Sequence, residues 1–552
     1  MYDDSTTEML PINAEKKPPR WKLRIAVILG ALVVLVLAGF AAAAFSLSGA
    51  SIGHDPNALA RVRTETLGGN VERVVATGPD GKEIPIKVES GGRLVPTQKL
   101  PPGETVSLAV TFKRPAAVGW LVGETSEEQL TLRTPVAHVE DPWLTVKKPH
   151  SPRVAFDEAI RAFAYGQPDE LVHRRFSGPK SSASLGSQPP AGSIVARLAP
   201  RSWEQLGKPE TVTWFPKGEG NAASLAASPA PGSEVSPATE LKLTFSKPVK
   251  KALGGGEPTI SPSAGGKWVE TNAHTLVFQP SGWGAGLSTT VEVKLPKPAN
   301  VVEGDGSVRK TDTVEWTIPP GNELRLQQLL AQAGYLPVSW KPSGKPVATT
   351  PAGELAAAVA PPEGEFGWRY PNVPSGLKES WSPGEPNLAT EGALMAFESQ
   401  HEMEPDGVAG AEVWDELLKA AIAGERNPEK GYSYVHVTES LPETVFLWHN
   451  GKQIFTTPAN TGIPGAETEL GTFPVYLRYE ETTMSGENPD GSHYSDPGIM
   501  WVSYFNGGDA LHAFDRASYG TPQSLGCVEM PLEAAAEVWP YTPIGTLVTI
   551  ES

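Results

Sequence analysis

The chain has 552 residues, with 46 Lys and Arg against 63 Asp and Glu and a net charge of −17 at neutral pH. This acidic balance, with no basic patch beyond the amino-terminal flank, argues against nucleic-acid binding. Gly and Pro number 56 and 54, which indicates many turns and linkers rather than long helices. At about 100 to 200 residues per domain, we expect three or four domains outside any membrane segment.

An uncharged, mostly apolar run covers residues 25–47 and follows a basic cluster made up of Lys16, Lys17, Arg20, Lys22 and Arg24. As a helix at about 1.5 Å per residue it would reach roughly 34 Å, enough to cross a hydrocarbon core of about 30 Å. We therefore predict a cytoplasmic tail at residues 1–24, a single-pass signal anchor at 25–47 and an extracytoplasmic remainder. The alanines at 41–44 keep a cleaved signal peptide open as the alternative.

Two stretches are typical of small all-β modules. Residues 55–150 contain short β-branched segments such as "VERVVATG" and "ETVSLAVTFKRP" between turns, which predicts an immunoglobulin-like sandwich. Residues 221–320 repeat the pattern and resemble the bacterial immunoglobulin-like domains that act as wall spacers. Between the two modules, residues 151–220 are predicted to form a linker or irregular segment, with one short helical run from Phe156 to Phe163.

Residues 322–424 have a helical pattern. One apolar stripe, ended by Gly334, consists of Leu326, Leu329, Leu330 and Ala333. The later sequence "MAFESQHEMEPDGVAGAEVW" resembles the second half of the three-helix peptidoglycan-binding domain, with Glu398 where that family usually has glutamine. Residues 341–387 are an insertion relative to the compact family form. A generic helical bundle is the alternative.

The last stretch, residues 431–552, is predicted to be β-rich. "TVFLWHNGKQIFTTP" predicts a hairpin, because Asn450 and Gly451 readily take the positive φ angles of a tight turn. A polar segment from Glu480 to Gly498 is predicted to be a long loop, and loops of that length usually act as lids or binding edges.

The only cysteine of the chain is Cys527, in "SLGCVEMP". A lone thiol is either an inert buried side chain or a nucleophile. A free thiol with a pKa of about 8.5 needs a neighbouring base at neutral pH, and His512 is the candidate. The amides of Gly526 and Cys527 are candidates for an oxyanion hole, because glycine permits a tight turn and close approach. A core histidine at a strand end is the alternative for His512.

The segments "TGIPGAETELGTFPVY", "LHAF" and "SLGCVEMP", in this order, resemble the L,D-transpeptidase catalytic domain. The resemblance implies that His512 and Cys527 are the catalytic pair and that Ser524 and Gly526 are the flanks of the motif. It implies that Cys527 attacks the carbonyl after the L-centre of diaminopimelate in a tetrapeptide stem, expels D-alanine and forms a thioester. An amine of a second stem then completes a crosslink, and water in its place makes the site an L,D-carboxypeptidase.

The sequence departs from the family motif in three respects: Leu525 replaces its histidine, Val528-Glu529 its basic or amide residue, and Ala513 its small Gly or Ser. The histidine of this family is generally oriented by a backbone carbonyl, which Ala513 or Leu525 can supply. We assign Glu529 to substrate binding. Our hypothesis is that its charge holds a cation, either a local arginine such as Arg516 or the free amine of diaminopimelate.

Further candidates for the substrate groove, next to the polar segment, are His493, Tyr494 and Trp501, although aromatic side chains of a β-rich domain more often belong to the core. No H-E-x-x-H or cysteine-rich pattern is present, so we predict no metal and no cofactor. The sequence thus predicts a membrane-anchored cell-wall L,D-transpeptidase whose partners are peptidoglycan stem peptides and glycan. A non-enzymatic wall-binding scaffold and a protease acting on proteins are the alternatives.

Overall fold

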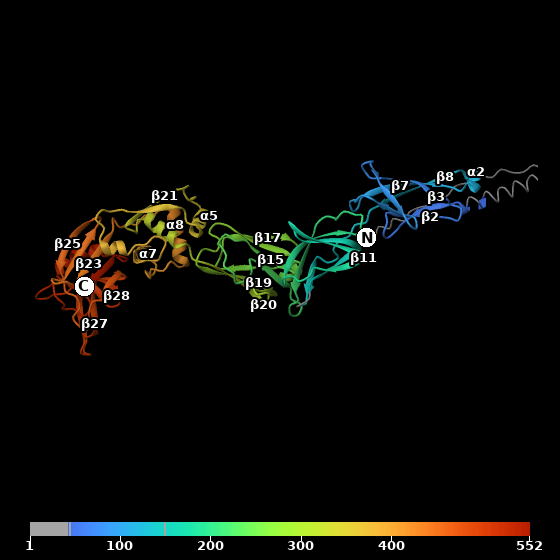
Figure 1. Cartoon of the computed structure of the whole chain (residues 1–552). Helices are drawn as coiled ribbons and strands as arrows, with labels where there is room; N and C mark the ends of the chain where they lie inside the picture. The colour runs from blue at the N-terminus through green and yellow to red at the C-terminus, as the bar shows by residue number, and fades with distance from the viewer. Residues whose placement is uncertain (1–41, 44–45, 148–150) are drawn as a thin grey trace, which may run out of the picture. The chain divides into compact units, whose positions relative to one another are not determined.

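The computed structural model describes residues 42–43, 46–147 and 151–552 (Figure 1). Over these ranges, no helix has both the length and the apolar character that a membrane span requires. The span predicted at residues 25–47 lies outside the described residues apart from four positions near its end, and the tail predicted before it lies outside them entirely. Apart from short exchanged segments, the chain divides between Trp214 and Phe215 into two compact units.

The first unit begins with two four-stranded antiparallel sheets, ordered β1-β2-β6-β5 and β4-β3-β7-β8. Alternate side chains of β7, among them Val106, Leu108 and Phe112, are buried in a shared core, as a half-buried strand requires. The predicted β-rich character is confirmed here, and the immunoglobulin-like identity stays a prediction. The elements are β1 (Ala50–Gly53), β2 (Ala60–Thr64), β3 (Asn70–Thr77), β4 (Glu83–Ile84), β5 (Ile86–Glu89), β6 (Arg93–Pro96), β7 (Thr105–Lys113), α2 (Ala116–Val122) and β8 (Thr125–Arg133).

Residues 151–220 form most of a five-stranded sheet, so the predicted linker and helical run are wrong. The order is β11-β10-β12-β13-β9, with β9 (Trp143–Val146), β10 (Arg153–Gln167), β11 (Glu170–Ser184), β12 (Gly192–Ala199) and β13 (Glu210–Pro216). Phe156, Ile160 and Phe163 have helical spacing but are all buried side chains of β10. Register shifts on both sides of Ile160 explain this, because a bulge breaks the two-residue alternation of a strand.

The second unit starts with a seven-stranded β module ordered β16-β19-β14-β15-β18-β17, with β20 beside β19. The predicted alternation of Leu241, Leu243 and Phe245 is confirmed, since all three are buried. Trp316 of β20 is fully buried in the same core. The elements are β14 (Ser224–Ser228), β15 (Leu241–Phe245), α3 (Val249–Leu253), β16 (Thr259–Ser261), β17 (Gly266–Asn272), β18 (Thr275–Pro280), β19 (Thr289–Val302) and β20 (Val308–Ile318).

The helical module follows directly. The Asn322 side chain caps α4 by accepting a hydrogen bond from the Leu324 amide (2.9 Å), and Gly334 ends the helix with a φ of 93°. The insertion predicted at 341–387 folds into α5, β22 and α6. The elements are α4 (Glu323–Ala333), β21 (Val338–Pro342), α5 (Pro351–Val359), β22 (Gly364–Trp368), α6 (Ser375–Glu379), α7 (Leu388–Gln400) and α8 (Ala411–Ala423).

Glu398 on α7 is a fully buried carboxyl group in this module. One of its oxygens accepts a hydrogen bond from the Gly407 amide (2.9 Å), and the other has no hydrogen-bond partner in the described part of the chain. Burial raises the pKa of Glu398 to about 7, and nearby Asp406 adds to the effect. The Glu398 carboxyl group therefore ties helix α7 to the Asp-Gly turn and titrates near neutral pH.

The last domain, orange to red in Figure 1, has the sheets β25-β24-β23-β31-β26 and β27-β28-β29-β30. Val435 and Val445 of the first sheet share a core with Leu511 and Val528 of the second. The predicted hairpin at Asn450-Gly451 is confirmed as β24 and β25. The elements are β23 (Ser433–Thr438), β24 (Thr444–His449), β25 (Lys452–Pro458), β26 (Gly471–Pro474), β27 (Leu477–Glu487), β28 (His493–Asn506), β29 (Asp509–Ala513), β30 (Val528–Met530), α9 (Leu532–Val538), a 3₁₀ turn (Trp539–Tyr541) and β31 (Leu547–Glu551).

Candidate active site

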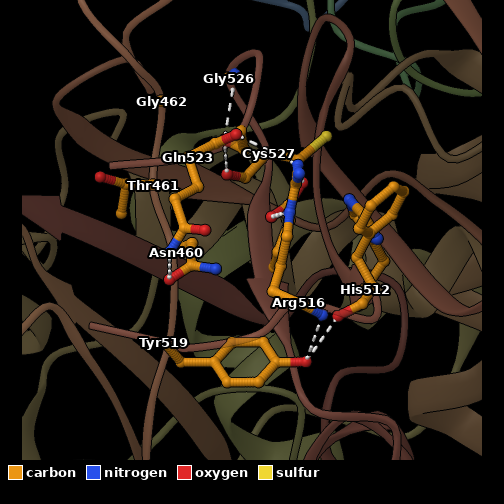
Figure 2. Close-up of polar contacts among 12 residues, drawn as sticks. Asn460, Thr461, Gly462, His512, Arg516, Tyr519, Gln523, Gly526 and Cys527 are labelled. Atoms are coloured by element: carbon orange, nitrogen blue, oxygen red, sulfur yellow. Dashed lines mark hydrogen bonds and ion pairs between the residues drawn. The ribbon is translucent and has the colours of Figure 1, made fainter. Parts of the chain in front are cut away.

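The cysteine stands at the end of a tight turn that leads into β30. The buried Ser524 hydroxyl donates to the carbonyl oxygen of Cys527 (2.5 Å) and accepts from the Gly526 amide (3.3 Å). Figure 2 shows Gly526 and Cys527 of this turn. Gly526 has a φ of 113°, and a Cβ at this position would lie 2.4 Å from a carboxylate oxygen of Asp509. Only glycine fits this turn without strain, and the serine closes it.

The sheet brings the cysteine and the histidine to one face. Strands β29 and β30 are parallel neighbours, with His512 opposite Glu529. Because side chains alternate along a strand, Cys527 and Glu529 point to the same side of β30. His512, Cys527 and Glu529 all line one cavity of about 70 Å³.

His512 is buried, with 3% of its surface exposed. Its Nδ1 lies 2.9 Å from the carbonyl oxygen of Ala513, and a carbonyl can only accept, so Nδ1 carries the proton and Nε2 the lone pair. Burial lowers the pKa of His512, which keeps the imidazole neutral at neutral pH. Ala513 is one of the two residues that the sequence offered for this orienting carbonyl.

The Cys527 thiol lies 3.6 Å from the carbonyl oxygen of Gly508. Burial raises the pKa of Cys527 to about 12, and the negative charges of Asp509 and Glu529 act in the same direction. The resting pair is therefore a neutral thiol and a neutral imidazole. A nucleophilic attack by this thiol requires that a base remove its proton during the attack.

The domain that holds this site matches a known family. The family model of the L,D-transpeptidase catalytic domain matches residues 433–550. These residues form an L,D-transpeptidase catalytic domain. The resemblance inferred from "LHAF" and "SLGCVEMP" is thereby confirmed for this part of the chain.

Solved structures of L,D-transpeptidases are similar to the chain at low identity. One from Mycobacterium smegmatis is 12% identical over 60% of this chain and 100% of its own, with a TM-score of 0.20. The catalytic domain of the Enterococcus faecium enzyme is 26% identical over 21% of this chain and 95% of its own, with a TM-score of 0.20. A Mycobacterium tuberculosis enzyme with a faropenem-derived adduct is 13% identical over 61% of this chain and 100% of its own, also with a TM-score of 0.20. No curated protein matches the chain.

An ion pair ties the loop of the L,D-transpeptidase domain between β29 and β30 to the site. Arg516 binds both carboxylate oxygens of Glu529, through Nε (2.8 Å) and Nη2 (2.7 Å), and Nη2 also donates to the carbonyl oxygen of Gln523 (3.1 Å). Its guanidinium lies 4.5 Å from the centre of the Phe514 ring. Of the two cations that the sequence offered for Glu529, the local arginine is the one in place.

Asn460 anchors the same loop from the other side. Its buried side-chain oxygen accepts from the Gln523 side chain (3.0 Å; Figure 2) and from the Gly520 amide (3.1 Å). Its backbone exchanges two hydrogen bonds of 2.9 Å with Glu529. Sequence reasoning missed Asn460, although it stands immediately before the "TGIPGAETELGTFPVY" segment that carries part of the family resemblance. This position next to a family segment was the signal that could have identified Asn460 from the sequence.

The prediction of a long loop from Glu480 to Gly498 is wrong, because most of this segment belongs to the hairpin of β27 and β28. Half-buried residues alternate with exposed ones through Thr482, Met484 and Gly486, and this alternation supports strands despite the polar composition. The hairpin covers the cysteine, because four of its residues line the cavity that contains Cys527: Met484, Tyr494, Asp496 and Ile499.

The predicted substrate residues separate into two groups. Tyr494 and Glu529 line the cavity with Cys527. His493 is exposed at the start of β28, and Trp501 packs against Trp539 with ring centres 5.2 Å apart, so neither lines this cavity. Within the described ranges, no group of three or more His, Cys, Asp or Glu side chains is arranged to hold a metal ion.

Proposed function

We propose that this protein is a peptidoglycan L,D-transpeptidase that works through a thioester on Cys527. The observation that carries the proposal is that Cys527 and His512 line one cavity inside the domain that matches the L,D-transpeptidase family. A lone thiol beside a neutral imidazole with its Nδ1 proton fixed is the arrangement that a cysteine acyl transferase needs.

In the first half-reaction, Nε2 of His512 accepts the thiol proton while Sγ of Cys527 attacks the carbonyl carbon. The amides of Gly526 and Cys527 hold the developing oxyanion. In the resting site the Gly526 amide donates a long hydrogen bond (3.3 Å) to the neutral Ser524 hydroxyl. An anionic oxygen is a stronger acceptor than a neutral hydroxyl, so the oxyanion attracts this amide more strongly than Ser524 does. His512 then returns the proton to the leaving amine of D-alanine, which leaves a thioester.

In the second half-reaction, an amine of another stem attacks the thioester carbonyl. The C–S bond breaks, an amide bond forms, and the proton taken up by His512 returns to the sulfur of Cys527. Water in place of the amine gives a tripeptide and makes the same site a carboxypeptidase. The nature of the acyl acceptor therefore decides which product is formed.

The other modules support action on the cell wall. We infer that the helical module at residues 322–424 binds peptidoglycan and that the β modules act as spacers between the wall and the membrane. The apolar run at residues 25–47, after its basic cluster, supports a single membrane anchor with the catalytic domain on the extracytoplasmic side. Each of these assignments rests on sequence resemblance or pattern.

The test uses the purified full chain and a disaccharide tetrapeptide as donor. We expect intact-protein mass spectrometry to show an acyl adduct on Cys527, with release of D-alanine and formation of crosslinked dimers. Cys527→Ala should give none of these, with an unchanged circular dichroism spectrum as the control for folding. Sacculus binding without any acyl adduct would indicate a scaffold, and cleavage of protein substrates would indicate a protease.

A further inference from the structure

Three charged side chains line the Cys527 cavity: Asp496, Arg516 and Glu529. Arg516 engages both oxygens of Glu529, so these two charges compensate each other. No hydrogen bond or ion pair joins the Asp496 carboxylate to another described residue. The three side chains therefore carry a net charge of −1, and Asp496 is the carboxylate that has neither a hydrogen bond nor an ion pair within the ranges that the structure describes.

Asp496 belongs to the hairpin that covers the cysteine. It lies on β28 opposite Met484 and two residues after Tyr494, and all three side chains line the cavity. The charge of Asp496 acts on His512 of the candidate catalytic pair. It favours a higher pKa of His512, although the larger effect of burial lowers that pKa overall. It also contributes to the raised pKa of Arg516. The carboxylate thus acts on the space in which the thioester would react.

The two possible acceptors of a thioester differ in charge. A primary alkyl amine has a pKa of about 10 and arrives at neutral pH mostly as an ammonium ion, whereas water is neutral. A half-buried carboxylate that lines the cavity attracts the ammonium and has little effect on the local amount of water. The charge of the cavity therefore favours the amine.

We propose that Asp496 is a specificity-determining residue that binds the ammonium group of the acyl acceptor and favours crosslinking over hydrolysis. This inference rests on the proposed function. The ammonium loses one proton to solvent by way of Asp496. As the N–C bond forms and the C–S bond breaks, a second proton passes from the nitrogen to His512 and then to the sulfur of Cys527.

The experiment measures crosslinked dimer per D-alanine released, by mass spectrometry of the products, for the full chain with a disaccharide tetrapeptide as donor and acceptor. In Asp496→Asn this ratio should fall about five- to tenfold, the range expected for one charge-assisted contact. Asp496→Glu should restore part of it. Glu487→Gln, which neutralises an exposed carboxylate on the same hairpin, should leave it unchanged. Added salt should lower the ratio of the wild type and not that of Asp496→Asn.

The outcomes separate this inference from the proposed function. An unchanged ratio in Asp496→Asn, with D-alanine still released, overturns the acceptor role and leaves the transpeptidase assignment intact. A parallel fall of D-alanine release and dimer formation also overturns it, because Asp496 would then act on His512 or on the hairpin. Absence of D-alanine release in the wild type overturns the proposed function itself.

Discussion

Arg516→Met removes the cation that holds Glu529 and leaves a carboxylate with 4% of its surface exposed and no partner of opposite charge. Breaking a buried ion pair from one side costs about 3–5 kcal/mol. The Arg516 side chain is 31% exposed, so solvent screens part of this interaction, and we expect about 2–3 kcal/mol. The cost should fall on the segment between His512 and Cys527, which the ion pair ties to β30.

Hydrogen exchange followed by mass spectrometry measures this local free energy. Amides of this segment, such as those of Phe514 and Gly520, should lose about 30- to 150-fold in protection, which corresponds to the same 2–3 kcal/mol. The matched control is Glu551→Gln, which breaks an exposed pair with His436 and should cost less than about 1 kcal/mol.

A double variant, Arg516→Met with Glu529→Leu, should recover part of the loss, because it leaves no buried charge without a partner. If Arg516→Met cost no more than the control, or if the double variant lost the sum of both single effects, the ion pair would not be what holds this loop.

Because burial raises the pKa of Cys527 to about 12, alkylation by iodoacetamide should accelerate steadily from pH 7 to 10, and a plateau below pH 8 would contradict the protonated resting thiol. Gly526→Ala should abolish acyl-enzyme formation, since the new Cβ would overlap Asp509 at a φ of 113°; full activity would show that the turn tolerates a side chain. The folded state raises the pKa of Glu398 from 4.5 to about 7, so the stability it supplies is complete below about pH 4.5 and is lost as pH rises through 7. Calorimetry of the full chain should therefore show the helical module losing on the order of 3 kcal/mol between pH 4.5 and 8, and Glu398→Gln should remove this dependence; the same dependence in both proteins would exclude Glu398 as its source.

The candidate catalytic pair was predictable from the sequence because its chemistry depends on residue type. The segments "LHAF" and "SLGCVEMP" place a histidine and a single thiol in a pattern that resembles the L,D-transpeptidase motif, and the family match now supports that domain assignment. The β-rich character of residues 55–150 and 221–320 was also predictable. Apolar and polar residues alternate in the sequence of strands such as β7 and β15, and this alternation matches their alternating burial. Local pattern was sufficient at these places.

Irregular strands were not predictable in the same way. The bulges around Ile160 give β10 a helical spacing of apolar residues, and the polar composition of residues 480–498 hides a hairpin. In both segments, pairing with a neighbouring strand determines the conformation. The sequence alone does not show which strand will be the neighbour.

By itself, the sequence determined the β-rich character of residues 55–150 and 221–320 and the residue types of Cys527 and His512. Only the tertiary structure decided that Arg516 neutralises Glu529, that Trp501 packs away from the cavity, and that Asp496 faces it without a partner. The physical reason is that charge compensation depends on distances between strands and loops that are remote in the chain. Sequence spacing defines such distances within one strand or helix, and the packing of the two sheets and the covering hairpin defines the rest.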